Sequence, residues 1–306
     1  MVFAPIVLFV YNRPEHARKT VVALQNNILA SYSELFIYSD GAKNDHAKAK
    51  VDEIREYIKT INGFKQVTIF NREKNFGLAT NIIDGVTKTV NEYGKVIVLE
   101  DDMITSPYFL QFMNDALDVY EEVENVACIH GYLYPLNTIL SETFFIKGAD
   151  CWGWAAWKRS WDLFEMDGKK LLKKIMEQKK QHEFNFDGTY NFLRMLKGQI
   201  SGRNDSWAVR WYASAFLANK LTLYPGISLV NNIGNDASGT HCGESNVFEV
   251  IIADRRIDVI KIDIVENKLA RSSFVSFYKE NLSFRKRLIR WLKRLLNIWD
   301  HAVYSG

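Results

Sequence analysis

Short runs of apolar, largely β-branched or aromatic residues alternate with longer amphipathic segments through the first 130 residues. Runs of this length and composition are typical of strands that are buried on both faces of a sheet. They occupy residues 5–10, 35–39, 67–70, 96–99 and 126–130. Strands alternating with helices predict an α/β fold with a mostly parallel, doubly wound central sheet flanked by helices.

The segments between these runs carry apolar residues at helical spacing. The first begins at Asn12-Arg13-Pro14, where proline suits the first turn of a helix. Its predicted buried face consists of Ala17, Val21, Leu24 and Ile28. Similar faces are expected within 51–61 and within 78–90, where Leu78 is the first apolar position, and a fourth helix is expected from Ser106-Pro107 to about residue 123. Ligands of such folds gather at the carboxyl ends of the strands, so the chemistry should follow each strand directly.

Beyond residue 130 the pattern is less regular. It contains a tryptophan-rich stretch, a lysine-rich helix near 168–181, a polar loop at 201–206 and a glycine-rich loop at 234–243. The tryptophans are Trp152, Trp154, Trp157 and Trp161. We therefore divide the chain into a first half, residues 1–125, a second half of the same domain, residues 126–282, and a terminal helix, residues 283–306.

The terminal segment 283–306 differs from the rest in charge. The whole chain of 306 residues has a formal net charge of +3, but this segment holds six basic residues and one acidic residue, so the remainder is slightly acidic. An acidic body argues against a general nucleic-acid binder. At 100° per residue, the leucines, isoleucines and tryptophans of 288–299 cover one half of a helix and the basic residues the other.

That arrangement is typical of a helix lying on an anionic membrane surface. Docking on the domain itself or in a dimer interface is the alternative, and the absence of acids from 283 to 299 favours the membrane. Three widely spaced cysteines, Cys128, Cys151 and Cys242, indicate neither a disulfide framework nor a zinc site and fit a reducing cytoplasm. With no apolar window of about 18 residues, we expect a cytoplasmic protein bound peripherally to the inner face of the membrane.

An acidic triplet, Glu100-Asp101-Asp102, directly follows the apolar run 96–99. Adjacent carboxylates at a strand end repel one another unless a cation neutralises them, and a divalent ion shared with diphosphate oxygens does so. Such an ion also offsets the charge that builds on a leaving diphosphate. A solvated acidic turn before the next helix is the alternative that the residues alone leave open.

The triplet belongs to a wider resemblance. Val98-Leu99-Glu100-Asp101-Asp102, the following Ser106-Pro107-Tyr108-Phe109, and Tyr11-Asn12-Arg13-Pro14 after the first strand resemble the GT-A glycosyltransferases. The N-acetylglucosaminyltransferases that begin hybrid N-glycan branching and bacterial sugar transferases for surface polysaccharides are the most similar members. The resemblance covers about residues 4–245 and implies a Rossmann-like GT-A fold, with residues 1–125 binding the nucleotide-sugar donor and residues 126–282 the acceptor.

The resemblance also implies roles for single residues. Asp102 would be the metal ligand for Mn²⁺ or Mg²⁺, with His241 as a further candidate, while Glu100 and Asp101 would support the ribose and metal-bound water. Asp40 would accept a hydrogen bond from the base, which favours uridine; a turn aspartate before glycine is the alternative. The other residues of the donor site would be Tyr11, Asn12, Arg13, Asn75, Gly77, Asn81, Trp152 and Trp154. The two tryptophans would lie near the floor of the sugar site, where an indole can cover the apolar face of a sugar ring. Arg13 could instead be a surface arginine, Asn75 a helix cap and the tryptophans ordinary core.

Inverting transfer needs a carboxylate that takes the proton from the attacking hydroxyl. By resemblance this base is Asp205, in Asn204-Asp205-Ser206-Trp207, with Asp187 and Asp150 as reserves. The loop 234–243 would close over the donor and exclude water.

The function expected from these observations is metal-dependent, inverting transfer of a sugar from a nucleotide-diphosphate donor, with UDP favoured, to a hydroxyl of a glycan or lipid-linked glycan in surface polysaccharide synthesis. The alternatives are a degenerate, non-catalytic glycan-binding or assembly module and a sugar nucleotidyltransferase. The second should show a glycine-rich loop after the first strand, where residues 10–14 contain no glycine. Walker and dinucleotide-binding glycine patterns are also absent, and a two-carboxylate hydrolase would not need the donor-site residues.

Overall fold

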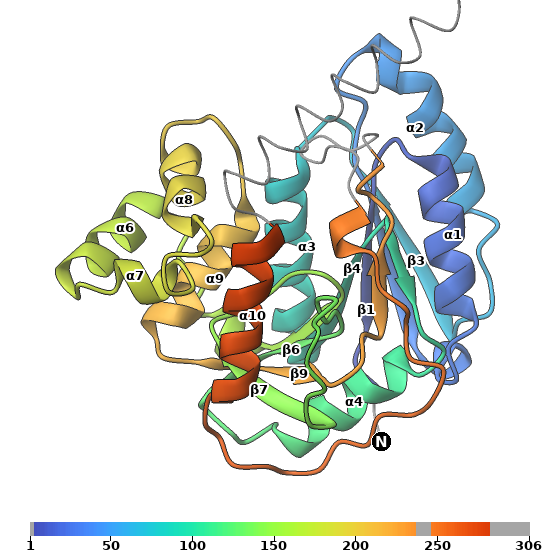
Figure 1. The fold of residues 1–306 in the computed structure, drawn as a ribbon. Helices are drawn as coiled ribbons and strands as arrows, with labels where there is room; N and C mark the ends of the chain where they lie inside the picture. The colour runs from blue at the N-terminus through green and yellow to red at the C-terminus, as the bar shows by residue number, and fades with distance from the viewer. Residues whose placement is uncertain (1–2, 237–245, 282–306) are drawn as a thin grey trace, which may run out of the picture.

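A central eight-stranded sheet organises the protein (Figure 1), whose computed structural model describes residues 3–236 and 246–281. The strand order is β3-β2-β1-β4-β8-β6-β9-β7. Strands β3, β2, β1 and β4 are parallel, β8 runs against β4 and β6, and β7 runs against β9. This mixed sheet with helices on both faces confirms the predicted α/β fold with a mostly parallel sheet.

The first half follows the predicted alternation of strand and helix. Its elements are β1 (Ile6–Val10), α1 (Pro14–Gln25), η1 (Ala30–Tyr32), β2 (Glu34–Ser39), α2 (Asp45–Ile58), β3 (Gln66–Asn71), α3 (Leu78–Tyr93), β4 (Lys95–Glu100), β5 (Met103–Thr105), α4 (Phe109–Val119) and β6 (Val126–His130). The five predicted strands are found, each with ends within one residue of those expected.

The first and fourth predicted helices extend beyond the observed ones, whereas α2 and α3 are longer than predicted. α1 ends at Gln25, so Ile28 lies beyond it and is 52% exposed, and its assignment to the buried face is wrong. Leu78 is also exposed because it is the first residue of α3 and lies at the mouth of a cavity. The fourth helix starts and ends inside its predicted range, since α4 covers only Phe109–Val119.

The second half adds strands to the same sheet and a group of short helices. Its elements are β7 (Thr143–Lys147), β8 (Trp154–Trp157), α5 (Lys158–Trp161), α6 (Gly168–Glu177), α7 (Gln181–Phe184), α8 (Phe192–Ile200), α9 (Trp207–Leu217), β9 (Leu221–Pro225), β10 (Val230–Asn232), η2 (Asn246–Phe248) and α10 (Lys268–Asn281). β8 lies between β4 and β6, so one sheet passes through both predicted halves. β10 pairs with β5 in a separate two-stranded sheet.

The two faces of the sheet carry different helices. Along β1, Ile6, Leu8 and Val10 belong to the core shared with α1, α2 and α4, whereas Val7 and Phe9 belong to the core shared with α3. This alternation is what a strand buried on both sides requires. Figure 1 shows α1 and α2 on one side of the sheet and α3 on the other.

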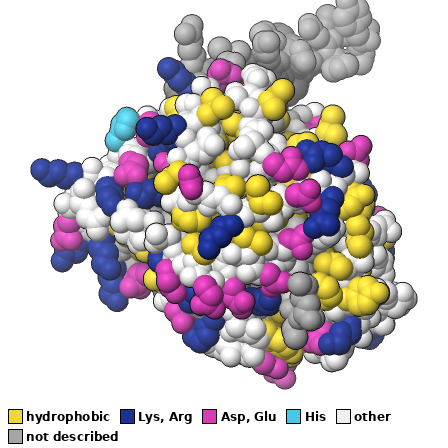
Figure 2. All heavy atoms as spheres, turned by 90° about the horizontal axis from the view of Figure 1, so that it is seen from below, with side chains coloured by type: hydrophobic (Ala, Val, Ile, Leu, Met, Phe, Trp, Pro, Cys, Tyr) yellow, Lys and Arg dark blue, Asp and Glu magenta, His cyan; other side chains and the backbone are white. Residues whose placement is uncertain are grey.

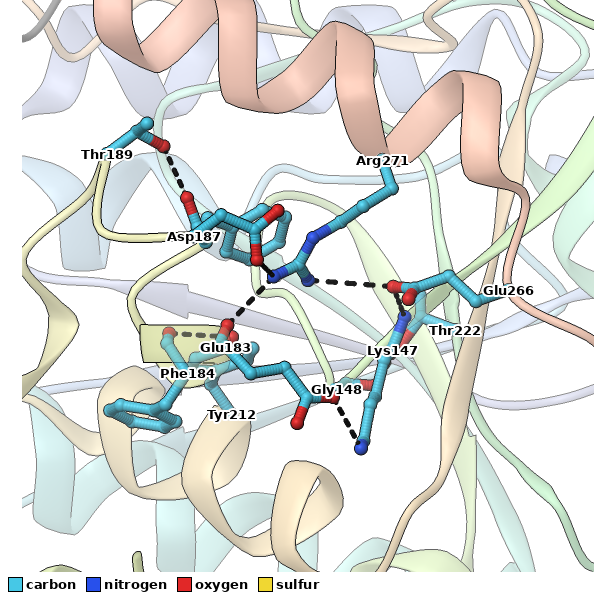
Figure 3. Close-up of polar contacts among 11 residues, drawn as sticks. Lys147, Gly148, Glu183, Phe184, Asp187, Thr189, Tyr212, Thr222, Glu266 and Arg271 are labelled. Atoms are coloured by element: carbon cyan, nitrogen blue, oxygen red, sulfur yellow. Dashed lines mark hydrogen bonds and ion pairs between the residues drawn. The ribbon is translucent and has the colours of Figure 1, made fainter. Parts of the chain in front are cut away.

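Ion pairs and hydrogen bonds hold α10 against the rest of the second half (Figure 3). Arg271 of α10 donates to the backbone oxygen of Glu183 at 2.8 Å and to Asp187 Oδ1 at 3.0 Å, and Glu266 accepts from the backbone N–H of Lys147. The apolar side of α10 packs in a cluster rich in aromatic rings. Tyr278 at the end of α10 is thereby held in the wall of the cavity described below.

The surface seen in Figure 2 carries acidic, basic and apolar side chains interspersed with one another. Among the residues that the structure describes, no helix combines the length and apolar character needed to cross a bilayer. The predicted terminal helix 283–306 and the greater part of the predicted loop 234–243 lie outside the described residues.

Candidate active site

A cavity of about 710 Å³ opens where β1, β2 and β4 end. Because these strands are parallel neighbours, the residues that follow them meet at one edge of the sheet. Most of the predicted site residues line this cavity, namely Tyr11, Asn12, Arg13, Asp40, Asn75, Gly77, Asn81, Glu100, Asp101, Asp102, Trp152 and Asp205. His241 lies outside the described residues.

Two carboxylates of the acidic triplet pair with one guanidinium. Arg13 Nη2 donates to Asp101 and, at 2.8 Å, to Asp102 Oδ2. Asp101 also accepts a long hydrogen bond of 3.4 Å from the backbone N–H of Tyr11, and its own backbone oxygen accepts from Thr20 of α1. Arg13 is therefore not a free surface arginine, because it joins the end of β1 to the end of β4.

One positive charge does not balance three carboxylates. Burial, together with the negative charges of Asp102 and Asp101, raises the pKa of Glu100 to about 8. Burial also raises the pKa of Asp101 to about 6, although Arg13 opposes that shift. The site therefore favours a proton, or a cation that replaces it.

Asp102 has the features of a metal ligand that relies on further ligands from a substrate. Its Oδ1 atom is buried and has no hydrogen-bond partner. Gly234 lies so close that an added Cβ would come within 2.1 Å of Asp102 Oδ2. Within residues 3–236 and 246–281, no three His, Cys, Asp or Glu side chains converge as a ready-made metal site. The carboxylates present thus fit a hard divalent ion that takes its other ligands from outside the chain. The role of Asp102 as a metal ligand stays a prediction.

Asp40 organises the turn between β3 and α3. Its Oδ1 accepts from the backbone N–H groups of Gly41 and Phe76, both at 2.8 Å, and its Oδ2 accepts from Gly77 N at 3.0 Å and Asn75 Nδ2 at 3.1 Å. A carboxylate offers about four acceptor positions, so the chain itself fills those of Asp40. The predicted hydrogen bond from a nucleotide base to Asp40 is therefore not available in this conformation, and the alternative of a turn aspartate fits the contacts.

The neighbouring amides of the predicted donor site are also held by the chain. Asn75 bridges Asp40 and the backbone oxygen of Gly41, and Gly77 has a φ of 74°, a value that glycine adopts without strain. Asn81 is 2% exposed and accepts from Arg72 Nε at 2.9 Å. These contacts shape the cavity wall, and direct contact of Asn75 or Asn81 with a donor stays a prediction.

The two tryptophans predicted beside the sugar have different surroundings. Trp152 is partly exposed and lines the cavity. Trp154 is 1% exposed and packs against Trp161, Trp207 and Trp211. Since β8 points this indole into the core, the prediction that Trp154 covers a sugar is wrong.

Of the three carboxylates considered as a base, two line the cavity. The Asp205 side chain is 66% exposed, lies 3.3 Å from Arg210 and comes just before α9. Asp150 also lines the cavity. Asp187 does not line it and instead pairs with Arg271, as Figure 3 shows.

Several lining residues, Lys43 among them, were given no role by the sequence, and Gly234 was placed only as the first residue of the loop 234–243. Gly234 lies next to the Asp102 side chain because β10 pairs with β5. The backbone N–H of Ile233 donates to the backbone oxygen of Asp102 at 2.9 Å. Lys43 lies beside Tyr11, whose hydroxyl accepts its backbone N–H at 3.1 Å. Strands as short as β5 and β10 leave no hydrophobic pattern from which this approach could be predicted.

Comparison with known proteins gives one family. The family model described as glycosyl transferase family 2 matches residues 6–184, and no curated protein matches the chain. Similar solved structures include a mannosyltransferase, PcManGT from Pyrobaculum calidifontis, in complex with GDP-Man and Mn²⁺, which is 12% identical over 43% of this chain and 36% of its own, with a TM-score of 0.31. S. aureus TarS is 13% identical over 47% and 24%, with a TM-score of 0.32.

Mouse xyloside xylosyltransferase 1, in its apo form, is 9% identical over 43% of this chain and 53% of its own, with a TM-score of 0.30. The present chain thus covers less than two thirds of each of these three structures. These three likenesses do not bear on the site of the present chain. The specific likeness to N-acetylglucosaminyltransferases stays a prediction.

Proposed function

The chain belongs to glycosyl transferase family 2, and from this premise we propose that it moves one sugar from a nucleotide-diphosphate donor to a hydroxyl of an acceptor glycan, with inversion and with the help of Mn²⁺ or Mg²⁺. The observation that carries the proposal is the group formed by Arg13 and the acidic triplet at the edge of the sheet. One guanidinium cannot neutralise three carboxylates, and Asp102 keeps a buried oxygen without a partner.

Each part of this group has a role in the proposed reaction. A bound divalent ion would offset the negative charge that develops on the leaving diphosphate. Asp102 would hold that ion, and Asp101 would keep Arg13 at the mouth of β1, where a guanidinium can also fork onto a phosphate oxygen. Glu100 would gain a negative charge when the ion replaces its proton.

Asp205 is the proposed general base. It would take the proton from the acceptor hydroxyl while that oxygen forms the new bond to the anomeric carbon and the bond to the diphosphate breaks. Single displacement of this kind inverts the anomeric centre and needs no covalent nucleophile. Support comes from the exposure of Asp205 to the cavity and from its place before α9.

The proposal extends to the donor base and the acceptor. The resemblance favours uridine through Asp40, but the turn occupies the acceptor positions of Asp40, so we propose a donor with either uridine or guanosine. We propose a glycan or lipid-linked glycan of surface polysaccharide synthesis as the acceptor, met at the inner face of the membrane. The support is the basic, apolar segment 283–306.

Replacement of Asp205 tests the proposed reaction. With Mn²⁺, a UDP- or GDP-linked sugar and a hexose or N-acetylhexosamine acceptor, the wild-type protein should release nucleotide diphosphate and form a disaccharide. Asp205→Asn should lower kcat by about 10²–10⁴, the usual contribution of a general base, and leave donor affinity unchanged. Asp187→Asn, the same change outside the cavity, is the control that should keep normal kcat. Normal turnover by Asp205→Asn would exclude Asp205 as the base.

A further inference from the structure

Residues 150–152 lie beside the acidic triplet although they are 50 residues away in sequence. β8 pairs antiparallel with β4 through Val98 and Trp154. When the same register is extended beyond the ends of both strands, residues 150–152 lie opposite residues 100–102. Consistent with this placement, burial and the charges of Asp150 and Glu100 raise the pKa of Cys151. The segment 150–152 therefore adjoins the place proposed for the diphosphate.

Two hydrogen bonds fix the carboxylate of Asp150 and leave acceptor positions of its oxygens open. Its Oδ1 accepts the backbone N–H of Cys151 at 2.8 Å, and its Oδ2 accepts the hydroxyl of Tyr224 at 3.0 Å. The side chain is 24% exposed and lines the cavity. Since a carboxylate offers about four acceptor positions, about two remain for a ligand.

Asp150 also lacks a cationic partner. Within the described residues no lysine or arginine pairs with it, and the basic group recorded closest to it is His130 Nε2 at 3.7 Å. That nitrogen accepts the backbone N–H of Trp152 at 3.1 Å, and burial lowers the pKa of His130, so the ring is neutral at physiological pH. His130 thus fixes the segment 150–152 without neutralising Asp150.

The indole of Trp152 is held in place by neighbouring aromatic rings. Tyr132 and Phe248 meet it edge to face, with ring centroids at 4.8 Å and 5.5 Å. Trp152 still lines the cavity, as does Asp150 two residues earlier. A fixed indole beside a carboxylate with open acceptor positions is a combination suited to a sugar ring, which has an apolar face and a rim of hydroxyl donors.

We propose that Asp150 and Trp152 form the subsite for the transferred sugar, and that this sugar is neutral or carries an N–H group, such as a hexose or an N-acetylhexosamine. Asp150 accepts hydrogen bonds from two sugar donors, and Trp152 covers the apolar face. The inference rests on the proposed function, because it places the sugar of a nucleotide donor next to the triplet.

The charges of the cavity decide against an acidic sugar. Asp150 and the triplet are both negative. Arg13 is paired with Asp101 and Asp102, Lys147 is paired with Glu183 at 2.7 Å, and Lys43, the other lysine of the cavity wall, follows β2 beside Tyr11. Since no lysine or arginine of the described residues pairs with Asp150, the carboxylate of a uronic acid placed there would be repelled by a like charge. A uronic acid donor should therefore bind through its nucleotide alone.

Calorimetric titration with Mn²⁺ separates the sugar subsite from the nucleotide site. The ligands are UDP, UDP-glucose, UDP-N-acetylglucosamine and UDP-glucuronate, with GDP and GDP-mannose as the second series. Asp150→Asn should weaken binding of the preferred neutral nucleotide sugar by about ten-fold, the effect of losing a charge-assisted hydrogen bond, and change binding of the nucleotide diphosphate by less than about two-fold. Tyr224→Phe, which removes one donor to Asp150, should act in the same direction by a smaller factor, and Asp187→Asn should have no effect.

The outcomes distinguish the two proposals. Unchanged affinity of Asp150→Asn for the nucleotide sugar, an equal loss for sugar and diphosphate, or tight binding of UDP-glucuronate would overturn the sugar subsite and leave the proposed function standing. A wild-type protein that binds none of the nucleotides with Mn²⁺ would overturn the proposed function itself. If Asp150→Asn fails to fold, Tyr224→Phe decides: equal affinity of this variant and wild type for the nucleotide sugar counts against the subsite.

Discussion

Three consecutive residues of this protein carry carboxylates, and one guanidinium, that of Arg13, pairs with two of them. Glu100 responds with a pKa of about 8 and Asp101 with one of about 6, because burial and mutual repulsion disfavour their ionised forms. The protein thus holds protons there that its unfolded chain would release near pH 4 to 5. A divalent ion can take their place only as they leave, so metal affinity and proton binding are linked.

The stability of the metal-free protein should therefore fall as the pH rises from about 5 to 8. A raised folded-state pKa means that the native state binds more protons than the unfolded state in this window, and stability decreases with pH wherever that holds. Melting temperatures measured across this range should decline more steeply for wild type than for Glu100→Gln, which cannot ionise there. Mn²⁺ with a nucleotide diphosphate should stabilise wild type more at pH 8 than at pH 6. Equal slopes for the two proteins would contradict the pKa of Glu100.

At the scale of elements, the turns that follow the strands are built by side chains as much as by the backbone. Asp40, after β2, accepts hydrogen bonds from the turn that leads into α3, and Arg13, after β1, reaches the end of β4. The cavity floor is therefore fixed before any ligand binds. A residue that looks ligand-binding in sequence can serve this purpose instead.

Asp40→Ala should destabilise the protein by about 2–4 kcal/mol, because it leaves the backbone N–H groups of Phe76 and Gly77 without their acceptor. Urea denaturation gives this free energy of unfolding. The variant should not change the preference between UDP and GDP at the temperature where both proteins are folded. A switch in that preference without loss of stability would restore the role of Asp40 in base recognition.

Most strands of the first half were predictable because they are continuous apolar runs buried on both faces, as in residues 6–10 and 96–99. β3 at the sheet edge is only partly buried, and its short apolar run still marked it. β8 was not predictable, because its sequence, Trp154-Ala155-Ala156-Trp157, joins the sheet between β4 and β6 through long-range pairing. Missing this strand also gave Trp154 the wrong role, since strand periodicity turns its side chain into the core. Local pattern cannot show which distant strand a short segment will meet.

At the scale of the whole molecule, one cavity joins the two predicted halves. The residues after β1 and β4 were predictable as its lining from the predicted parallel sheet, because the carboxyl ends of parallel strands lie at the same edge. Gly234 and the aromatic wall with Tyr224 and Tyr278 depend on β10, β9 and α10, whose approach the sequence did not reveal. The division into donor and acceptor halves stays a prediction.

The segment 283–306, outside the described residues, carries the prediction of membrane contact. Deleting it should abolish sedimentation with vesicles that contain phosphatidylserine or phosphatidylglycerol and leave donor affinity unchanged. Vesicles of phosphatidylcholine are the control, and wild type should bind them weakly. Vesicle binding that survives the deletion would place the contact elsewhere on the protein.

The central claim is that Asp102 binds a divalent ion together with a nucleotide diphosphate. The most direct test is a thermal-shift panel of UDP, GDP and their sugar derivatives, with and without Mn²⁺, on wild type and Asp102→Asn. A ligand at about 100 times its dissociation constant stabilises the native state by about 2.7 kcal/mol. We predict a rise in melting temperature for wild type with one nucleotide series, only with Mn²⁺, and none for Asp102→Asn. Equal shifts in both proteins, or no shift with any nucleotide, would contradict the account.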